Sequence, residues 1–156
     1  MFNIVLVAPE IPPNTGNVIR LAANTGCRLH LVEPLGFAMT DPLLRRAGLD
    51  YHEYVDVQRH ASWPAFVATA RPEPARLFAF ATAARRSLAD ARFAPGDWLV
   101  FGAETSGLSA AVRAALDEAQ MLRLPMRAGQ RSLNLGTAVA VAVFEAWRQN
   151  GYADSV

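Results

Sequence analysis

A stretch near the N-terminus, PPNTGNVIRLAANTG (residues 12–26), places amide side chains around one charged residue, Arg20. If the stretch is a helix, Asn17, Arg20 and Asn24 lie three and four residues apart and share one face. A face of amides and one guanidinium can bind a phosphate, a hydroxyl or a carboxylate. The alternative is that the amides cap the helix or bond to nearby backbone, as short polar side chains commonly do.

A second polar stretch, FGAETSGLS (residues 101–109), follows a predicted strand and precedes a predicted helix. Gly102 and Gly107 permit tight backbone geometry at the end of the strand. Glu104 is set into the loop between these glycines. The pattern GxExxG is weakly specific by itself, and it differs from the G-x-G-x-x-G fingerprint of dinucleotide-binding proteins. Without that fingerprint after the first strand, an NAD-dependent oxidoreductase is disfavoured.

A third stretch, LRLPMRAGQRSLNLGTA (residues 122–138), has the same order of strand, polar loop and helix. Arg127 and Arg131 lie in the loop, and the sequence SLN opens the helix. Ser132 or Asn134 as an ordinary helix N-cap is the alternative to a functional role. Because ligands of open α/β sheets bind at the carboxyl ends of the strands, the polar stretches predict one shared site.

The composition excludes several kinds of chemistry. All fifteen basic residues are Arg, so a Schiff-base lysine, a P-loop lysine and a lysine general base are absent. No G-x-S-x-G stretch is present, which disfavours a hydrolase of that type. His30, His52 and His60 show no metal-ligand spacing, and we interpret them as structural or surface residues without a metal. The net charge of +1 neither demands nor forbids a nucleic-acid partner.

The elements that must position these stretches follow from the pattern of apolar runs. It predicts one α/β domain over residues 1–156, with a mostly parallel sheet flanked by helices. Strands are predicted over residues 2–7, 28–34, 53–57, 75–82, 97–102 and 121–125, the last ending at Pro125. Helices are predicted over residues 14–26, 41–49, 63–70, 109–117 and 134–150, with Asn14, Asp41 and Ser109 at their starts and Gly26 as a stop.

The final helix contains AVAVAVFEAW (residues 138–147), which is apolar around most of its circumference. Such a helix is expected to be buried on several sides. In a chain of this length, either a partner subunit covers one side or the helix lies in a groove of its own domain.

The cellular context is predicted from three simple features. No basic segment precedes an apolar run at the N-terminus, so no signal peptide is expected. No apolar run is long enough to span a bilayer. The single cysteine, Cys27, excludes an internal disulfide and fits the reducing cytoplasm.

The polar stretches together resemble a known family. PEIPPNTGNVIRLAANTG, RRAGLDYHEY, GAETSGL and RLPMRAGQRSLNLGTAVAVAVFEAWRQ are similar to the tRNA (cytidine/uridine-2′-O-)-methyltransferases of the SPOUT superfamily. The resemblance covers roughly residues 2–152, and its motif blocks occur in the family's order. It implies a homodimer whose C-terminal part is threaded as a deep trefoil knot, although knots are rare in proteins. It also implies that the protein binds S-adenosyl-L-methionine in the knot. With this methyl donor it would methylate the wobble ribose in the anticodon stem-loop of leucine tRNAs.

The resemblance also assigns roles to individual positions. Asn14 and Arg20 match the Asn and Arg of the family's first motif, Glu104 the Glu of the second, and Asn134 the Asn of the third; these are the candidate catalytic residues. The positions that match the cofactor site are Phe80, Gly102, Leu124, Met126, Ser132 and Leu133.

Some positions depart from the family's pattern. Ala103 and Ser106 stand where the second motif usually has a Pro and a basic residue. Gly136 and Thr137 replace a common Ser-Asn pair. Where a Lys-Gly turn is common, this chain has Ala83 and Ala84. The missing basic residues bear on RNA affinity and on the choice of substrate.

Arg20 is a poor general base on energetic grounds. An ordinary guanidinium has a pKa above about 12, so its deprotonation at neutral pH costs roughly 7 kcal/mol. We therefore expect Arg20 to bind phosphate and to stabilise the developing alkoxide, with Glu104 and Asn134 as positioning residues.

RNA binding is expected from local pairs of arginines, because the net charge provides little long-range attraction. The candidates are Arg45 with Arg46, Arg85 with Arg86, and Arg127 with Arg131. Three readings stay open: a wobble-nucleotide methyltransferase, a ribose methyltransferase for another tRNA position or ribosomal RNA, and a dimeric binding module without catalysis.

Overall fold

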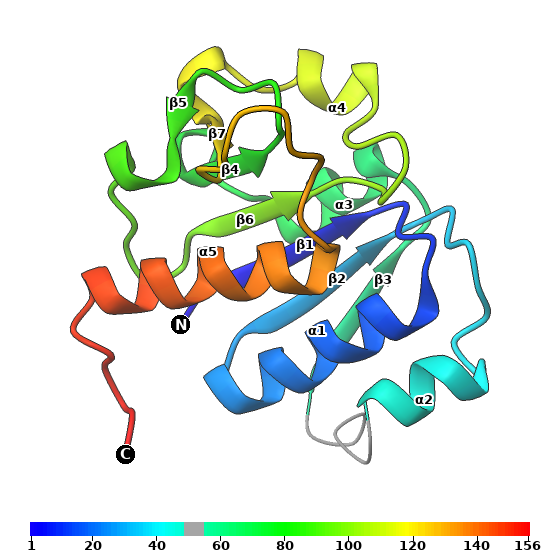
Figure 1. Cartoon of the computed structure of the whole chain (residues 1–156). Coiled ribbons are helices and arrows are strands. Elements are labelled where there is room, and N and C mark those ends of the chain that lie inside the picture. Colours follow the sequence, from blue (N-terminus) through cyan, green and yellow to red (C-terminus); the bar gives the residue numbers. More distant parts are fainter. Residues whose placement is uncertain (49–54) are drawn as a thin grey trace.

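A seven-stranded sheet with helices on both faces forms the centre of the computed structural model, which describes residues 1–48 and 55–156 (Figure 1). Each pair of neighbouring strands is parallel. The strands are β1 (Asn3–Val7), β2 (Arg28–Val32), β3 (Val57–His60), β4 (Leu77–Phe80), β5 (Arg86–Ser87), β6 (Trp98–Phe101) and β7 (Met121–Arg123). The α-helices are α1 (Pro12–Thr25), α2 (Pro42–Gly48), α3 (Trp63–Ala70), α4 (Ala110–Ala114) and α5 (Leu135–Gln149).

The strand order is β3-β2-β1-β6-β4-β7-β5. This arrangement confirms the predicted parallel sheet and brings the carboxyl ends of β1, β6 and β4 side by side. The ends of β1 and β6 continue into the first two polar stretches, and β7, which pairs with β4, continues into the third. The late strand β7 lies between two earlier strands, β4 and β5, which sequence patterns do not indicate.

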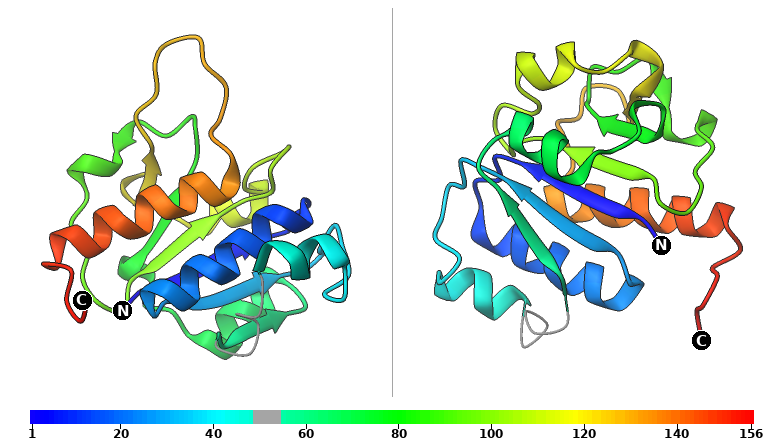
Figure 2. Two further views of the ribbon diagram at one scale, coloured as in Figure 1. Left: turned by 60° about the horizontal axis from the view of Figure 1, so that its bottom comes forward. Right: turned by 180° about the vertical axis from the view of Figure 1, so that it is seen from behind.

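Alternate residues along the strands point to opposite faces of the sheet and form two apolar cores. Ile4 and Leu6 of β1 pack with residues of α1, α2 and α5 on one face. Val5 and Val7 pack on the other face, with Phe66 of α3 and residues of α4. In the right-hand view of Figure 2, seen from behind, α3 lies in front of the sheet, on the face opposite α1 and α5.

Helix α1 begins two residues earlier than predicted, so the prediction that Asn14 caps it was wrong. Ile11 is the N-cap, and the helix starts with two prolines. Proline suits the first turn, where a backbone N–H has no partner within the helix. Asn14 is instead buried in the first turn. Gly26 ends the helix as predicted, with a φ of 68°.

Strand β5 was not predicted from the sequence, and two predicted strands have other bounds in the structure. A strand was predicted over residues 53–57, but β3 covers Val57–His60; residues 53 and 54 lie outside the described residues. Pairing with β2 sets this register, and it joins His60 of β3 to His30 of β2 at 3.0 Å. Strand β7 ends at Arg123 rather than Pro125, because the chain leaves the sheet there and Leu124 turns toward a pocket.

The final helix, α5, is capped by Asn134, whose Oδ1 accepts from the backbone N–H of Thr137 at 3.2 Å. One side of α5 is buried, including Val139 and Val143. On another side Val141 is 42% exposed and Phe144 46% exposed. The helix therefore packs on its own domain and still presents an apolar face.

Candidate active site

A pocket of about 450 Å³ lies at the carboxyl ends of β1, β6 and β4. Each of the three polar stretches contributes to its lining, and the first contributes only Asn14. The buried part of the lining includes Asn14, Phe80, Phe101, Gly102, Ala103, Leu108 and Leu135. The structure thus places these segments, distant in sequence, around one cavity.

The loop after β6 is closed tightly upon itself. Ala103 and Gly107 exchange two backbone hydrogen bonds, of 3.1 and 2.8 Å, and Gly107 has a φ of 68°. A Cβ at position 102 would lie 2.2 Å from the carbonyl carbon of Gly107, so no larger residue fits there. The glycines of GxExxG are therefore required by the turn, and the turn carries Glu104.

The Glu104 carboxylate binds the loop that follows β1. It accepts from the backbone N–H of Glu10 at 2.7 Å, from that of Ile11 at 3.1 Å and from Asn14 Nδ2 at 3.1 Å. The two backbone donors directly precede α1: Ile11 is its N-cap and Glu10 the residue before it. Glu104 acts here as an acceptor that joins the loops after β1 and β6.

Asn14 extends this network to the third polar stretch. Its Oδ1 accepts from Asn134 Nδ2 at 2.7 Å, while its own Nδ2 donates to Glu104. Asn14 is only 6% exposed. Three of the four predicted catalytic residues therefore form one hydrogen-bonded chain, Glu104–Asn14–Asn134.

Glu10 and Thr105 strengthen the same junction, and sequence reasoning missed both. Glu10 accepts from the Thr105 backbone N–H at 2.9 Å and from its hydroxyl at 2.8 Å. Glu104 in turn accepts from the backbone of Glu10. Each residue lies within a quoted stretch of the sequence, but only the structure shows that the two are paired.

All six positions that the resemblance assigned to the cofactor line the pocket. Phe80 and Gly102 belong to its buried part, and the ring of Phe80 stacks on that of Phe101 with centroids 4.7 Å apart. The other four come from the loop between β7 and α5: Leu124, Met126, Ser132 and Leu133. Figure 2 shows that loop arching away from the sheet.

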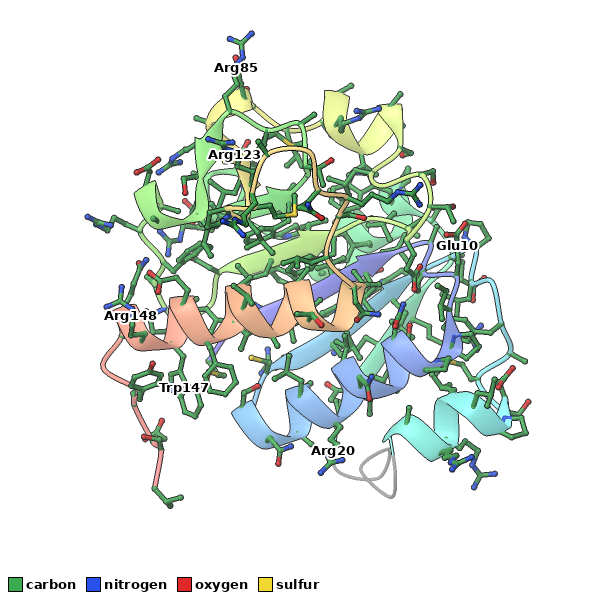
Figure 3. The ribbon with its side chains drawn as sticks, viewed as in Figure 1. Glu10, Arg20, Arg85, Arg123, Trp147 and Arg148 are labelled. Carbon is green, nitrogen blue, oxygen red and sulfur yellow. The ribbon has the colours of Figure 1, made fainter. Side chains whose placement is uncertain are left out.

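Arg20 does not join this pocket within one chain. It lines a separate hollow of about 480 Å³ between α1 and α2, together with Asn17 and Arg46. Figure 3 shows Arg20 pointing away from the end of β1 at which Glu10 lies. Glu104 and Asn134, expected as positioning residues, both bond to Asn14.

The close packing of α2 on α1 explains how the hollow forms. A Cβ at Gly16 would lie 2.6 Å from the Cβ of Ala47 and from the carbonyl oxygen of Leu44. The glycine therefore allows the helices to approach, and Arg46 reaches the hollow that Arg20 lines.

The other arginines proposed for RNA binding differ in their surroundings. Arg45, Arg127 and Arg131 are exposed, the last two in the loop before α5. Arg86 instead donates to the carbonyl oxygens of Ala119 and Asp90, at 2.6 and 2.9 Å. Arg86 therefore joins two loops of the fold, and this structural role explains the residue without any contact to RNA.

His30 and His60 form a buried pair on the face of the sheet that α3 covers. Phe66 and Trp98 surround them at centroid distances of 5.0 to 5.8 Å. Burial, with a smaller effect of His60, lowers the pKa of His30 to about 4. These two histidines are structural, as predicted, whereas His52 lies outside the described residues.

Across residues 1–48 and 55–156, no three His, Cys, Asp or Glu side chains are grouped so as to hold a metal ion. Within the same residues, no helix is both long and apolar enough to cross a membrane.

The chain was compared with known proteins. Residues 1–144 match the model of the SpoU rRNA Methylase family. A tRNA (cytidine(34)-2′-O)-methyltransferase of Polaromonas sp. is 70% identical over 155 residues, which are 99% of this chain and 94% of that protein.

The chain is also similar to solved structures of methyltransferases. One, described as giving insight into 2-OH methylation of C/U34 on tRNA, superposes with a TM-score of 0.85 at 47% identity and covers 97% of each chain. The SpoU methyltransferase AviRb of Streptomyces viridochromogenes, in complex with AdoMet, has a TM-score of 0.83 at 25% identity. It is a larger protein, of which this chain covers 61%, while 97% of this chain is matched.

Proposed function

The chain belongs to the SpoU rRNA methylase family, and on that premise we propose that it methylates the 2′-oxygen of the wobble ribose, on cytidine or modified uridine, in leucine tRNAs. The observation that carries the proposal is the Glu104–Asn14–Asn134 chain beside a pocket at the strand ends. The cytidine 34 relative and the C/U34 structure support the wobble position. The AdoMet complex of AviRb supports S-adenosyl-L-methionine as methyl donor.

The pocket suits a cosubstrate of this size and character. Its volume of about 450 Å³ falls in the range of small-molecule sites, and its lining mixes apolar side chains with a few polar groups. The donor supplies an electrophilic methyl group on a sulfonium. In this proposal Phe80 and Leu124 pack against its apolar parts, and Gly102 lets the backbone approach closely. Alignment of the methyl with the ribose oxygen can contribute up to roughly 7–11 kcal/mol.

In this proposal the pocket is held in shape by Asn14, Glu104 and Asn134, and Arg20 contacts the RNA substrate. We propose that Arg20 binds phosphate and stabilises the alkoxide, while the proton leaves to water or to a phosphate oxygen. Arg20→Lys is then expected to keep measurable activity with an unchanged pH profile. Rescue of that variant only at alkaline pH would contradict this role and favour a general base.

We propose that the protein acts as a homodimer in which Arg20 serves the pocket of the partner subunit. The exposed Val141 and Phe144 on α5 supply an apolar face, and Arg20 lies outside the pocket of its own chain. Arg20→Ala and Leu133→Arg proteins, the second altered at an exposed position of the pocket lining, are each expected to be inactive, but to regain activity after mixing and refolding together. Continued inactivity of the mixture, or a monomer in sedimentation, would contradict the proposal.

The remaining features of the family follow as proposals. We propose one domain over residues 1–156 that works in the cytoplasm and whose C-terminal part is threaded as a trefoil knot. The placement of β7 between β4 and β5 supports the threading. An experimental structure in which the chain from residue 121 to 149 passes outside the loop of residues 81–85 would contradict it.

The position of methylation is tested with leucine tRNA that carries a 2′-deoxy nucleotide at the wobble position. Labelled S-adenosyl-L-methionine should transfer its methyl group to the unmodified tRNA and not to the deoxy form. Equal labelling of both would point to another tRNA position. Labelling of ribosomal RNA alone, or binding without transfer, would favour the alternative readings.

A further inference from the structure

A single cation lines the mouth of the pocket. Among the described residues that line it, Arg113 is the only basic one and Glu104 the only acidic one. Arg113 lies on α4 and is exposed, so it belongs to the mouth rather than to the floor. Exposed hydroxyl side chains, Thr82 and Ser106, line the same pocket.

The Arg113 guanidinium is not neutralised inside the structure. Within residues 1–48 and 55–156, no carboxylate lies within ion-pair distance of it. Glu104 shares the pocket, but its oxygens already accept from two backbone N–H groups and from Asn14. A positive charge is therefore available at the mouth for an anionic group of a ligand.

The chemistry of the substrate identifies that group. In RNA, the carbon that carries the 2′-hydroxyl is bonded to the carbon that carries the 3′-phosphate. When the 2′-oxygen enters a pocket that holds the methyl donor, a flanking phosphate must come to its mouth. A guanidinium binds two phosphate oxygens with two parallel N–H donors, which fixes orientation as well as position.

We propose that Arg113, assisted by the hydroxyls of Thr82 and Ser106, binds a phosphate that flanks the target ribose. The inference rests on the proposed function, because it needs RNA at this pocket. It gives Arg113 a role in positioning the ribose oxygen toward the methyl group. The carboxylate of the methyl donor has the same charge and is the competing source of the anion.

The test is RNA binding, which needs no catalysis. Binding of a leucine tRNA anticodon stem-loop is measured at a series of salt concentrations, with S-adenosylhomocysteine present. Arg113→Ala should weaken binding at low salt and reduce the log–log salt slope by about 0.7, the value for one phosphate on a single strand. Arg113→Lys should keep most of the slope, because it keeps the charge.

The matched control is Arg28→Ala, which makes the same change of charge. Arg28 is exposed at the start of β2, at the edge of the sheet opposite the pocket. Its salt slope should equal that of the wild type. An unchanged slope in Arg113→Ala, or an equal loss in both variants, would overturn the proposal.

Calorimetric titration with S-adenosyl-L-methionine separates the two sources of the anion. Its affinity should be the same for the wild type and for Arg113→Ala. Weaker cosubstrate binding with an intact RNA slope would assign Arg113 to the donor's carboxylate and overturn the inference. If the wild type binds RNA but transfers no methyl group, the proposed function fails. The salt slope of RNA binding then still shows whether Arg113 binds a phosphate. If the wild type binds no RNA, both fail.

Discussion

Replacement of Asn14 by alanine tests whether the hydrogen-bonded chain holds the pocket together. Asn14 joins the loops after β1 and β6 to the start of α5 through its bonds to Glu104 and Asn134. Alanine removes both bonds and leaves the helix backbone unchanged. The amide of Asn134 loses one acceptor, and Glu104 keeps its two backbone donors.

The size of the effect follows from the two bonds. A hydrogen bond to a carboxylate contributes about 1.5–3 kcal/mol, and one between neutral amides about 1 kcal/mol. Because Glu104 is only partly buried, we take the lower part of that range and expect a loss of about 2–3 kcal/mol. For a chain of this length that loss corresponds to a fall in Tm of about 5–10 °C.

The assay combines thermal unfolding, followed by circular dichroism, with titration of S-adenosyl-L-methionine. Asn14→Ala is expected to fold, to melt earlier and to bind the cosubstrate more weakly. Asn24→Ala is the control, since Asn24 is exposed near the end of the same helix and should change neither quantity. If Asn14→Ala kept both the Tm and the cosubstrate affinity of the wild type, the structural role of the network would be refuted.

Three further changes test other parts of the structure. Glu104→Gln should cost more activity than Asn14→Ala in a methyl-transfer assay, because one amide N–H₂ then faces a backbone N–H donor; equal losses would contradict this. Gly102→Ala should give little folded protein on expression, or no cosubstrate binding by calorimetry, since its Cβ meets the Gly107 backbone. Unfolding free energy, measured in urea, should fall as pH drops from about 6.5 to 4, because the unfolded chain binds a proton that buried His30 resists. The contribution of His30 is about 3 kcal/mol, and His30→Phe should flatten the dependence; an unaltered profile in that variant would exclude His30 as its cause.

The sequence predicted the sheet and most helices because these depend on local patterns. Apolar runs such as residues 2–7 become buried strands, and Ser109 and Gly26 mark helix ends as their chemistry dictates. The polar strand β3 was misplaced because its position is set by pairing with β2, a contact between segments far apart in the chain.

The candidate site was predicted unevenly for the same reason. The motif positions Asn14, Glu104 and Asn134 do meet at one pocket. The partner of each side chain depends on distances across the fold. The spacing of residues along the sequence therefore could not predict the pairing of Glu10 with Thr105. Helical periodicity correctly placed Asn17, Arg20 and Asn24 on one face, but it could not show that Arg20 lies outside the pocket of its own chain.

The most direct test of the central claim is methyl transfer to tRNA from cells that lack this gene. Labelled S-adenosyl-L-methionine and total tRNA are incubated with the protein, and the digested nucleosides are mapped by mass spectrometry. We expect one new 2′-O-methyl mark, at the wobble nucleotide of leucine tRNAs. No transfer by protein that demonstrably binds the cosubstrate, or a mark at another position, would contradict the claim.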